Sequence, residues 1–199
     1  MKINLKQIYK GLDEWRAERK ITAESQRQGY IRNVMEELGE LAAGLRDYAS
    51  WSKCDLRFCQ IHKEMAERVI VDAICDIAVL TINAGADINC NEKLESINTT
   101  TQTTRCNSSL SFLLSECGNF VYYGKFSSYI CFNQILLSCA KLCEYYGFNF
   151  QIAMDETIKE ISSRTGAYDE KAKKWVKDHS DEAKAKWYKA DYEKARIKK

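Results

Sequence analysis

Apolar side chains recur at three- and four-residue intervals through most of the chain, which is the spacing that gathers them on one face of an α-helix. The pattern predicts helices over about 5–19 and 64–84, and another that begins after a cap at Thr22 or Ser25. The polar stretch 50–63 is expected to connect the second and third of these helices. No run alternates as a strand does, and the chain has no proline, so we expect an all-α fold of long helices with short connections.

The second half of the chain resembles the first in its helical period and in two glycines that would end helices, Gly85 and Gly147. This similarity predicts a degenerate internal repeat in which each half forms one helical hairpin; a chance match of two amphipathic helix pairs is the alternative. The segments that correspond are Glu36–Leu41 with Ser115–Phe120, and Asp72–Ile88 with Gln134–Phe150. Two such hairpins are expected to pack as a four-helix-bundle core with flanking helices.

Local composition divides the chain into two parts. Residues 1–168 are expected to form the helical domain, with a first hairpin over 25–90 and a second over 110–168. Between the hairpins, residues 98–109 are rich in Thr, Asn and Ser and are predicted to be a linker. Residues 169–199 carry more Lys and Arg than Asp and Glu, with aromatic side chains among them, which predicts a charged helical C-terminal tail.

The overall balance of charge narrows the classes of partner. With 30 Lys and Arg against 28 Asp and Glu, the formal net charge is +2, so nucleic-acid binding is not expected. The longest apolar run, 69–86, is interrupted by Asp72, Asp76 and Asn83 and is not expected to span a membrane. The nine cysteines include no CxxC pair, and the first residues lack the apolar core of a signal peptide. We therefore expect reduced thiols in a cytoplasmic protein.

Acidic residues form the clearest candidate for chemistry. Glu36, Glu37 and Glu40 lie on one predicted helix, where residues three or four apart share a face, although such clusters are common on solvent-facing helices. Asp72 and Asp76 lie one turn apart among apolar neighbours, and a buried carboxylate is costly unless it is paired or bound to a metal. A narrow solvent-facing stripe is the alternative for this pair. If the two helices pack antiparallel, these carboxylates form an oxygen-only site suited to Mg²⁺ or Mn²⁺.

These motifs resemble those of the all-α nucleoside triphosphate pyrophosphatases, the family of the MazG-type enzymes and the dimeric dUTPases. That family holds Mg²⁺ between an EExxE motif on one helix and an ExxD motif on the next, and EELGEL supplies the first motif in full. The second is incomplete, because Ala73 stands where its first acid is expected. The resemblance implies Asp76 as a metal ligand, with Asp72 as a substitute for the missing acid. Asn83 also matches an asparagine common in that helix of the family.

A second match, over residues 159–168, is similar to the late dimeric-dUTPase motif in which a lysine, an arginine and a Gly-aromatic turn contact the substrate phosphates. It implies that Lys159 and Arg164 bind the β- and γ-phosphates, with Tyr168 as the aromatic residue of the turn. Cations near the phosphates agree with the chemistry, because a triphosphate brought to an acidic site needs positive charge on its far side. Two ordinary surface cations are the alternative.

Together these features predict a Mg²⁺-dependent pyrophosphohydrolase that cleaves a nucleoside triphosphate to the monophosphate and pyrophosphate, with Glu37 or Glu40 as general base. Gln26 and Asn33 are expected to bind the substrate, because their amides offer donor–acceptor pairs that can read a base. The family match implies that Asn83 binds the substrate as well. By resemblance, dUTP is favoured, with dCTP or a non-standard nucleotide as alternatives, and the protein is expected to be a homodimer. The competing hypotheses are a non-catalytic helical module with a degenerate metal site, which binds a nucleotide or a protein, and a metal-dependent phosphohydrolase of another family.

Overall fold

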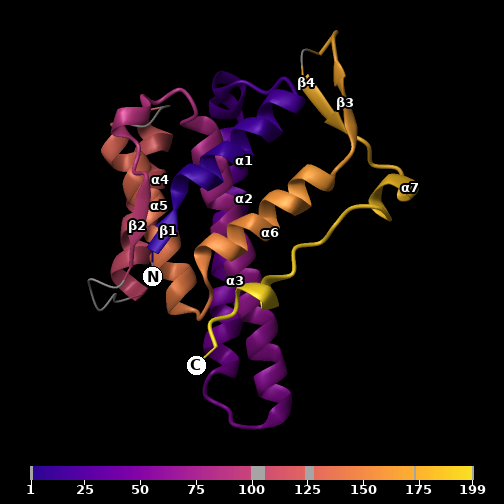
Figure 1. The fold of residues 1–199 in the computed structure, drawn as a ribbon. Helices are drawn as coiled ribbons and strands as arrows, with labels where there is room; N and C mark the ends of the chain where they lie inside the picture. The colour runs from indigo at the N-terminus through magenta and orange to yellow at the C-terminus, as the bar shows by residue number, and fades with distance from the viewer. Residues whose placement is uncertain (1, 100–105, 124–127, 173, 199) are drawn as a thin grey trace.

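The computed structural model describes residues 2–99, 106–123, 128–172 and 174–198, and these residues are mainly helical (Figure 1). This confirms the all-α fold class. The helices are α1 (Leu5–Glu18), α2 (Ala23–Trp51), α3 (Arg57–Ala84), α4 (Cys106–Tyr123), α5 (Tyr129–Tyr145), α6 (Phe150–Ser163) and the short α7 (Asp181–Lys184). Two small antiparallel pairs join β1 (Lys2–Asn4) to β2 (Ser96–Asn98), and β3 (Gly166–Asp169) to β4 (Lys174–Lys177). Single 3₁₀ turns, η1 and η2, span Cys90–Glu92 and Tyr192–Ala195.

The helices α2 and α3 form a long hairpin that extends well beyond the other helices (Figure 1). Of the two candidate caps, Thr22 is the one that begins α2, because its side chain accepts a hydrogen bond from the backbone N–H of Ser25 at 3.2 Å. The helix α3 ends as expected at Gly85. A β-carbon there would lie 2.6 Å from the ring of Phe132, so α5 packs against this end of α3 only because the residue is glycine.

The core forms around α3, which packs against α1, α2, α5 and α6. From Ile70 to Ala84 most of its side chains are buried, as the nearly continuous apolar sequence of this part requires. Tyr30 joins α2 to two other helices, because its ring lies 4.1 Å from that of Phe120 on α4 and its hydroxyl is hydrogen-bonded to Thr81 on α3 at 3.0 Å. The α2–α3 and α4–α5 hairpins thus share one core. A four-helix bundle and an internal repeat remain predictions of the sequence.

The prediction of a helical tail over residues 169–199 is wrong for most of this segment, because among its described residues only α7 is an α-helix. The chain after α6 forms the β3–β4 hairpin, then α7 and an extended segment that runs back alongside α6 (Figure 1). Side chains of α6 take the place of intrahelical acceptors: the backbone N–H of Tyr188 donates to Ser163 and that of Ala190 to Glu160, both within 2.9 Å. Because these acceptors come from a distant part of the sequence, local periodicity did not reveal the conformation.

The predicted start of the third helix and the predicted linker also differ from the structure. The helix α3 begins at Arg57, seven residues before the predicted start at Glu64, since a formed helix gains one hydrogen bond for each residue it adds. The predicted linker 98–109 begins at the end of β2, its residues 100–105 lie outside the described residues, and α4 begins within it at Cys106. The expectation that all cysteines are reduced is also wrong, because Cys54 and Cys59 form a disulfide across the α2–α3 connection. Their spacing is not that of a CxxC motif.

None of the helices in the described part of the chain combines the length and the apolar character needed to cross a membrane.

Candidate functional site

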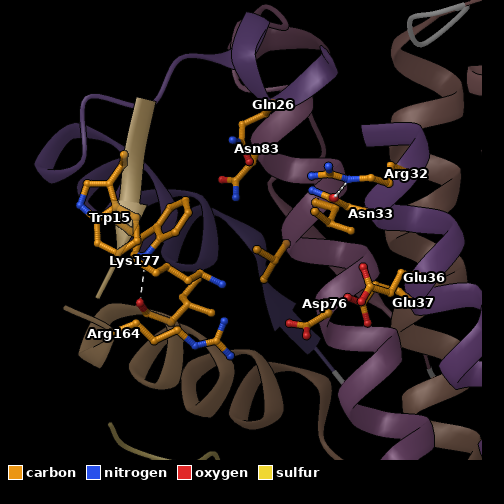
Figure 2. A pocket seen from close by; sticks show the side chains of 14 residues that line it. Trp15, Gln26, Arg32, Asn33, Glu36, Glu37, Asp76, Asn83, Arg164 and Lys177 are labelled. Atoms are coloured by element: carbon orange, nitrogen blue, oxygen red, sulfur yellow. Dashed lines mark hydrogen bonds between the residues drawn. The ribbon is translucent and has the colours of Figure 1, made fainter. Parts of the chain in front are cut away.

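A pocket of about 400 Å³ opens between the first half of α2, the C-terminal third of α3, and the elements that follow α6 (Figure 2). Its wall brings together parts of the chain from both halves of the sequence. The lining residues are Trp15 from α1; Gln26, Arg32, Asn33, Glu36 and Glu37 from α2; Asp76, Val79, Leu80 and Asn83 from α3; Ile161 and Arg164 from α6 and its end; and Trp175 and Lys177 from β4.

Three carboxylates form the acidic wall of the pocket. Glu36 and Glu37 of α2 face Asp76 of α3 in Figure 2. Burial, together with the negative charges of Asp76 and the other acids of the cluster, raises the pKa of Glu37 to about 8. Burial and the charge of Asp72, opposed by that of Arg164, raise the pKa of Asp76 to about 7. The protein therefore places negative groups where their charged forms are disfavoured.

Glu40 and Asp72 belong to the same cluster but do not line the pocket. Glu40 lies close enough to raise the pKa of both Glu37 and Asp76. The carboxylate of Asp72 is fixed by Tyr192, whose hydroxyl donates a hydrogen bond to Asp72 Oδ1 at 2.6 Å. Ala73, the position that the family motif would fill with an acid, is only 1% exposed and faces the core.

Cations from two different elements line the opposite wall. Arg164 follows α6, and Lys177 ends β4; in Figure 2 both side chains extend toward the acids. The positive charge of Arg164 acts to lower the pKa of Asp76, and the negative charges of Asp76 and Glu36 act to raise the pKa of Lys177. Opposite charges thus face one another across the pocket, and within the described residues no ion pair joins these cations to Glu36, Glu37 or Asp76.

Amide and aromatic side chains complete the lining of the pocket. Gln26, Asn33 and Asn83, the three amides predicted to bind substrate, all line it. Asn83 is 1% exposed, and its Oδ1 accepts a hydrogen bond from Arg16 at 2.6 Å, which fixes the orientation of the amide. Trp15 donates from Nε1 to the carbonyl of Ile161 at 3.2 Å, so its indole is held in the wall.

Two residues of the predicted phosphate site lie elsewhere. Lys159 bonds Glu156 at 2.7 Å on another face of α6, in a groove with Asp155. The ring of Tyr168, on β3, lies 4.9 Å from the ammonium group of Lys20 and does not line the pocket. Of the predicted phosphate ligands, the structure therefore brings Arg164 alone to the acids.

Arg32, Trp175 and Lys177 also line the pocket, and the sequence did not single them out. The mixture of aromatic and basic residues after 168 is the only signal for the last two, and it predicts a charged helical tail instead. Their positions depend on strand pairing, which the charge pattern does not report.

The chemistry of the acidic wall suits a hard divalent cation, since all its donors are carboxylate oxygens. Within the described residues no three His, Cys, Asp or Glu side chains converge as a complete metal-binding group. Mg²⁺ commonly takes one or two carboxylates and completes its shell with water and substrate phosphates, so Glu36, Glu37 and Asp76 are sufficient donors in kind and number. The pocket can thus place a cation, an anion and a planar base side by side.

Neither a scan against protein-family models nor searches of curated proteins and of solved structures finds a match to this chain.

Proposed function

We propose that the protein is a Mg²⁺-dependent nucleoside triphosphate pyrophosphohydrolase, which releases a nucleoside monophosphate and pyrophosphate. The observation that carries the proposal is the single pocket in which the acids Glu36, Glu37 and Asp76 face the cations Arg164 and Lys177. A Mg²⁺–triphosphate complex has the matching distribution of charge. The EELGEL motif, by its resemblance to the all-α pyrophosphatases, supports the same assignment.

In this proposal the two walls have separate tasks. Glu36, Glu37 and Asp76 would hold Mg²⁺, which when bound would supply a Lewis acid for the phosphate oxygens and favour ionisation of a water molecule. Glu37 or Glu40 accepts the proton of the water that attacks the α-phosphorus. Arg164 neutralises the charge that develops on the leaving pyrophosphate. Asp72, held by Tyr192, contributes its negative charge to the cluster or joins the ligands after a side-chain rotation.

In this proposal the amide side chains of the pocket orient the base of the substrate. Gln26, Asn33 and Asn83 would read the edge of the base, and Trp15 offers an indole face for stacking. By resemblance to the dimeric dUTPases, dUTP is the first candidate, followed by dCTP and non-standard nucleotides. A homodimer and a cytoplasmic location also belong to this proposal.

The deciding experiment is product analysis of the purified protein with dUTP and with each nucleoside triphosphate. We expect monophosphate and pyrophosphate in the presence of Mg²⁺ or Mn²⁺, and no products in EDTA or from Glu37→Gln. Glu64→Gln is the matched control, because Glu64 lies on α3 outside the pocket, where it accepts a hydrogen bond from Gln60. Release of orthophosphate would instead indicate a phosphohydrolase of another kind. No turnover of any nucleotide would refute the enzymatic proposal and favour the non-catalytic nucleotide- or protein-binding module.

A further inference from the structure

The cationic wall of the pocket contains one group that neither the motifs nor the family resemblance assigns. Arg164 has an acidic partner, since its guanidinium donates to Glu160 at 2.7 Å. Lys177 lines the same wall and joins no ion pair within the described part of the chain. Partial burial lowers the pKa of Lys177, and the positive charge of Arg164 lowers it further, against the opposing effect of the nearby acids. The positive charges of Lys177 and Arg164 therefore repel each other in the wall of the pocket.

The backbone fixes this arrangement. In the β3–β4 register Lys177 pairs with Gly166, two residues after Arg164, so strand pairing itself brings the two cations together. A β-carbon at Gly166 would overlap the carbonyl of Val176 and the ring of Trp175, which makes glycine necessary for this close pairing. The position of Lys177 is thus built into the fold and does not depend on a flexible surface loop.

The hairpin is also attached to the helical body beside the pocket. The guanidinium of Arg19 lies between two indoles, 5.1 Å from the ring of Trp175 on β4 and 5.2 Å from that of Trp15 on α1. The same guanidinium donates to the carbonyl oxygens of Ser162 and Arg164 at 3.0 and 3.3 Å. These contacts join β4, α1 and the end of α6, the three elements that surround the cationic wall.

We propose that Lys177 and Arg164 together bind the terminal phosphates of a nucleoside triphosphate, and that the β3–β4 hairpin is the phosphate-binding element of the pocket. The inference rests on the proposed function and deepens it: Lys177 takes the place that the resemblance gave to Lys159. An anion between the two cations removes their repulsion, and two charge-assisted contacts from a preformed wall distinguish a triphosphate from a monophosphate.

The direct test is binding of inorganic triphosphate, measured by titration calorimetry with and without Mg²⁺. Loss of a charge-assisted contact predicts that Lys177→Met binds about tenfold to a hundredfold more weakly, with a smaller dependence on salt. Lys177→Arg keeps the charge and should stay within about threefold of the unchanged protein. Lys174→Met is the matched control, because Lys174 lies on the same strand outside the pocket and should have no effect. Equal binding by Lys177→Met, or an equal loss in Lys174→Met, would overturn the proposal.

Turnover of nucleoside triphosphates separates this inference from the proposed function. If the protein releases pyrophosphate and Lys177→Met leaves KM unchanged, the enzyme stands and the role of Lys177 is refuted. If no nucleotide is hydrolysed but binding of triphosphate still depends on Lys177, the anion site stands and the reaction is refuted. We expect a raised KM with a smaller change in kcat, because Lys177 contacts phosphates already present in the ground state.

Discussion

Replacing Glu156 with glutamine is expected to lower the free energy of unfolding at neutral pH, because this carboxylate holds the C-terminal segment on α6. Glu156 is 1% exposed. It accepts hydrogen bonds from Lys159 at 2.7 Å, from the backbone N–H of Asp191 at 3.1 Å, from Lys194 at 3.3 Å, and from the hydroxyl of Tyr188. Glutamine preserves the shape of the side chain and removes its charge, so the change isolates the electrostatic part of the anchor.

The magnitude follows from the pKa of the carboxyl group. Burial acts to raise that pKa, but the hydrogen bonds from Lys159, Tyr188, Asp191 and Lys194 outweigh burial and lower it from the usual 4.5 to about 2. At about 1.4 kcal/mol for each pH unit, this corresponds to about 3 kcal/mol of stability. Because the two lysines are half exposed and solvent screens their charge, we expect a loss of about 2 kcal/mol in the variant.

The dependence on pH gives the prediction its sign. A carboxyl group with a lowered folded-state pKa stabilises the protein above pH 4.5, and this contribution is lost as the pH falls toward 2. The difference between Glu156→Gln and the unchanged protein should therefore be full at pH 7 and shrink steadily below pH 4.5. Urea unfolding followed by circular dichroism at several pH values measures it. The exposed pair of Glu95 with Lys6 supplies the control, and Glu95→Gln should cost less than about 1 kcal/mol. Equal stability of Glu156→Gln at pH 7, or a difference that does not change with pH, would refute the reasoning.

Three further predictions concern the acid cluster. The raised pKa values of Glu37 and Asp76 favour protonation near neutral pH, so affinity for Mg²⁺ should increase from pH 6 to pH 9. Calorimetry in buffers of different ionisation enthalpy measures the protons released on binding, and a pH-independent affinity would contradict this prediction. Ala73→Glu should not restore a metal ligand but destabilise the protein by roughly 3 kcal/mol or more, because it places a charge in the core; thermal unfolding with Ala73→Ser as control tests it, and a stable variant with tighter Mg²⁺ binding would refute it. Tyr192→Phe should cost about 1–3 kcal/mol in urea unfolding, because it leaves Asp72 without its hydrogen bond; an unchanged midpoint would show that this bond contributes nothing.

Sequence reasoning succeeded where local periodicity decides the structure. The caps and stops of the long helices are local features, so the sequence correctly placed Gly85 at the end of α3 and reduced the start of α2 to two candidate caps, one of which, Thr22, is correct. The acids also followed from local spacing, because three- and four-residue intervals place Glu37 and Asp76 on the faces where the two helices meet the pocket. Asn83, two turns beyond Asp76, lines the same pocket for the same reason.

It failed where a residue's position depends on rotation about a helix or on pairing with a distant segment. Lys159 and Arg164 are separated by about 140° around a helix axis, so both cannot face one pocket from a regular helix. Ala73 is offset from Asp72 by about 100°, which turns it from the acid cluster into the core. Lys177 reaches the pocket through the pairing of β4 with β3, and no periodicity in the charged tail encodes that register.

The carboxylates of this chain fall into two groups with opposite electrostatics, and the contrast bears on function. Glu156 and Glu193 are bound by cations of the protein itself, and hydrogen bonds from those cations lower both pKa values to about 2. Among the described residues no cation forms an ion pair with Glu37 or Asp76, and their pKa values rise to about 8 and about 7. Structural acids lower the free energy of the folded protein, whereas these two raise it at neutral pH. A protein that places unpaired acids opposite an unpaired lysine in one pocket gains stability only when a ligand supplies both charges, and a divalent cation bound to a polyphosphate does so.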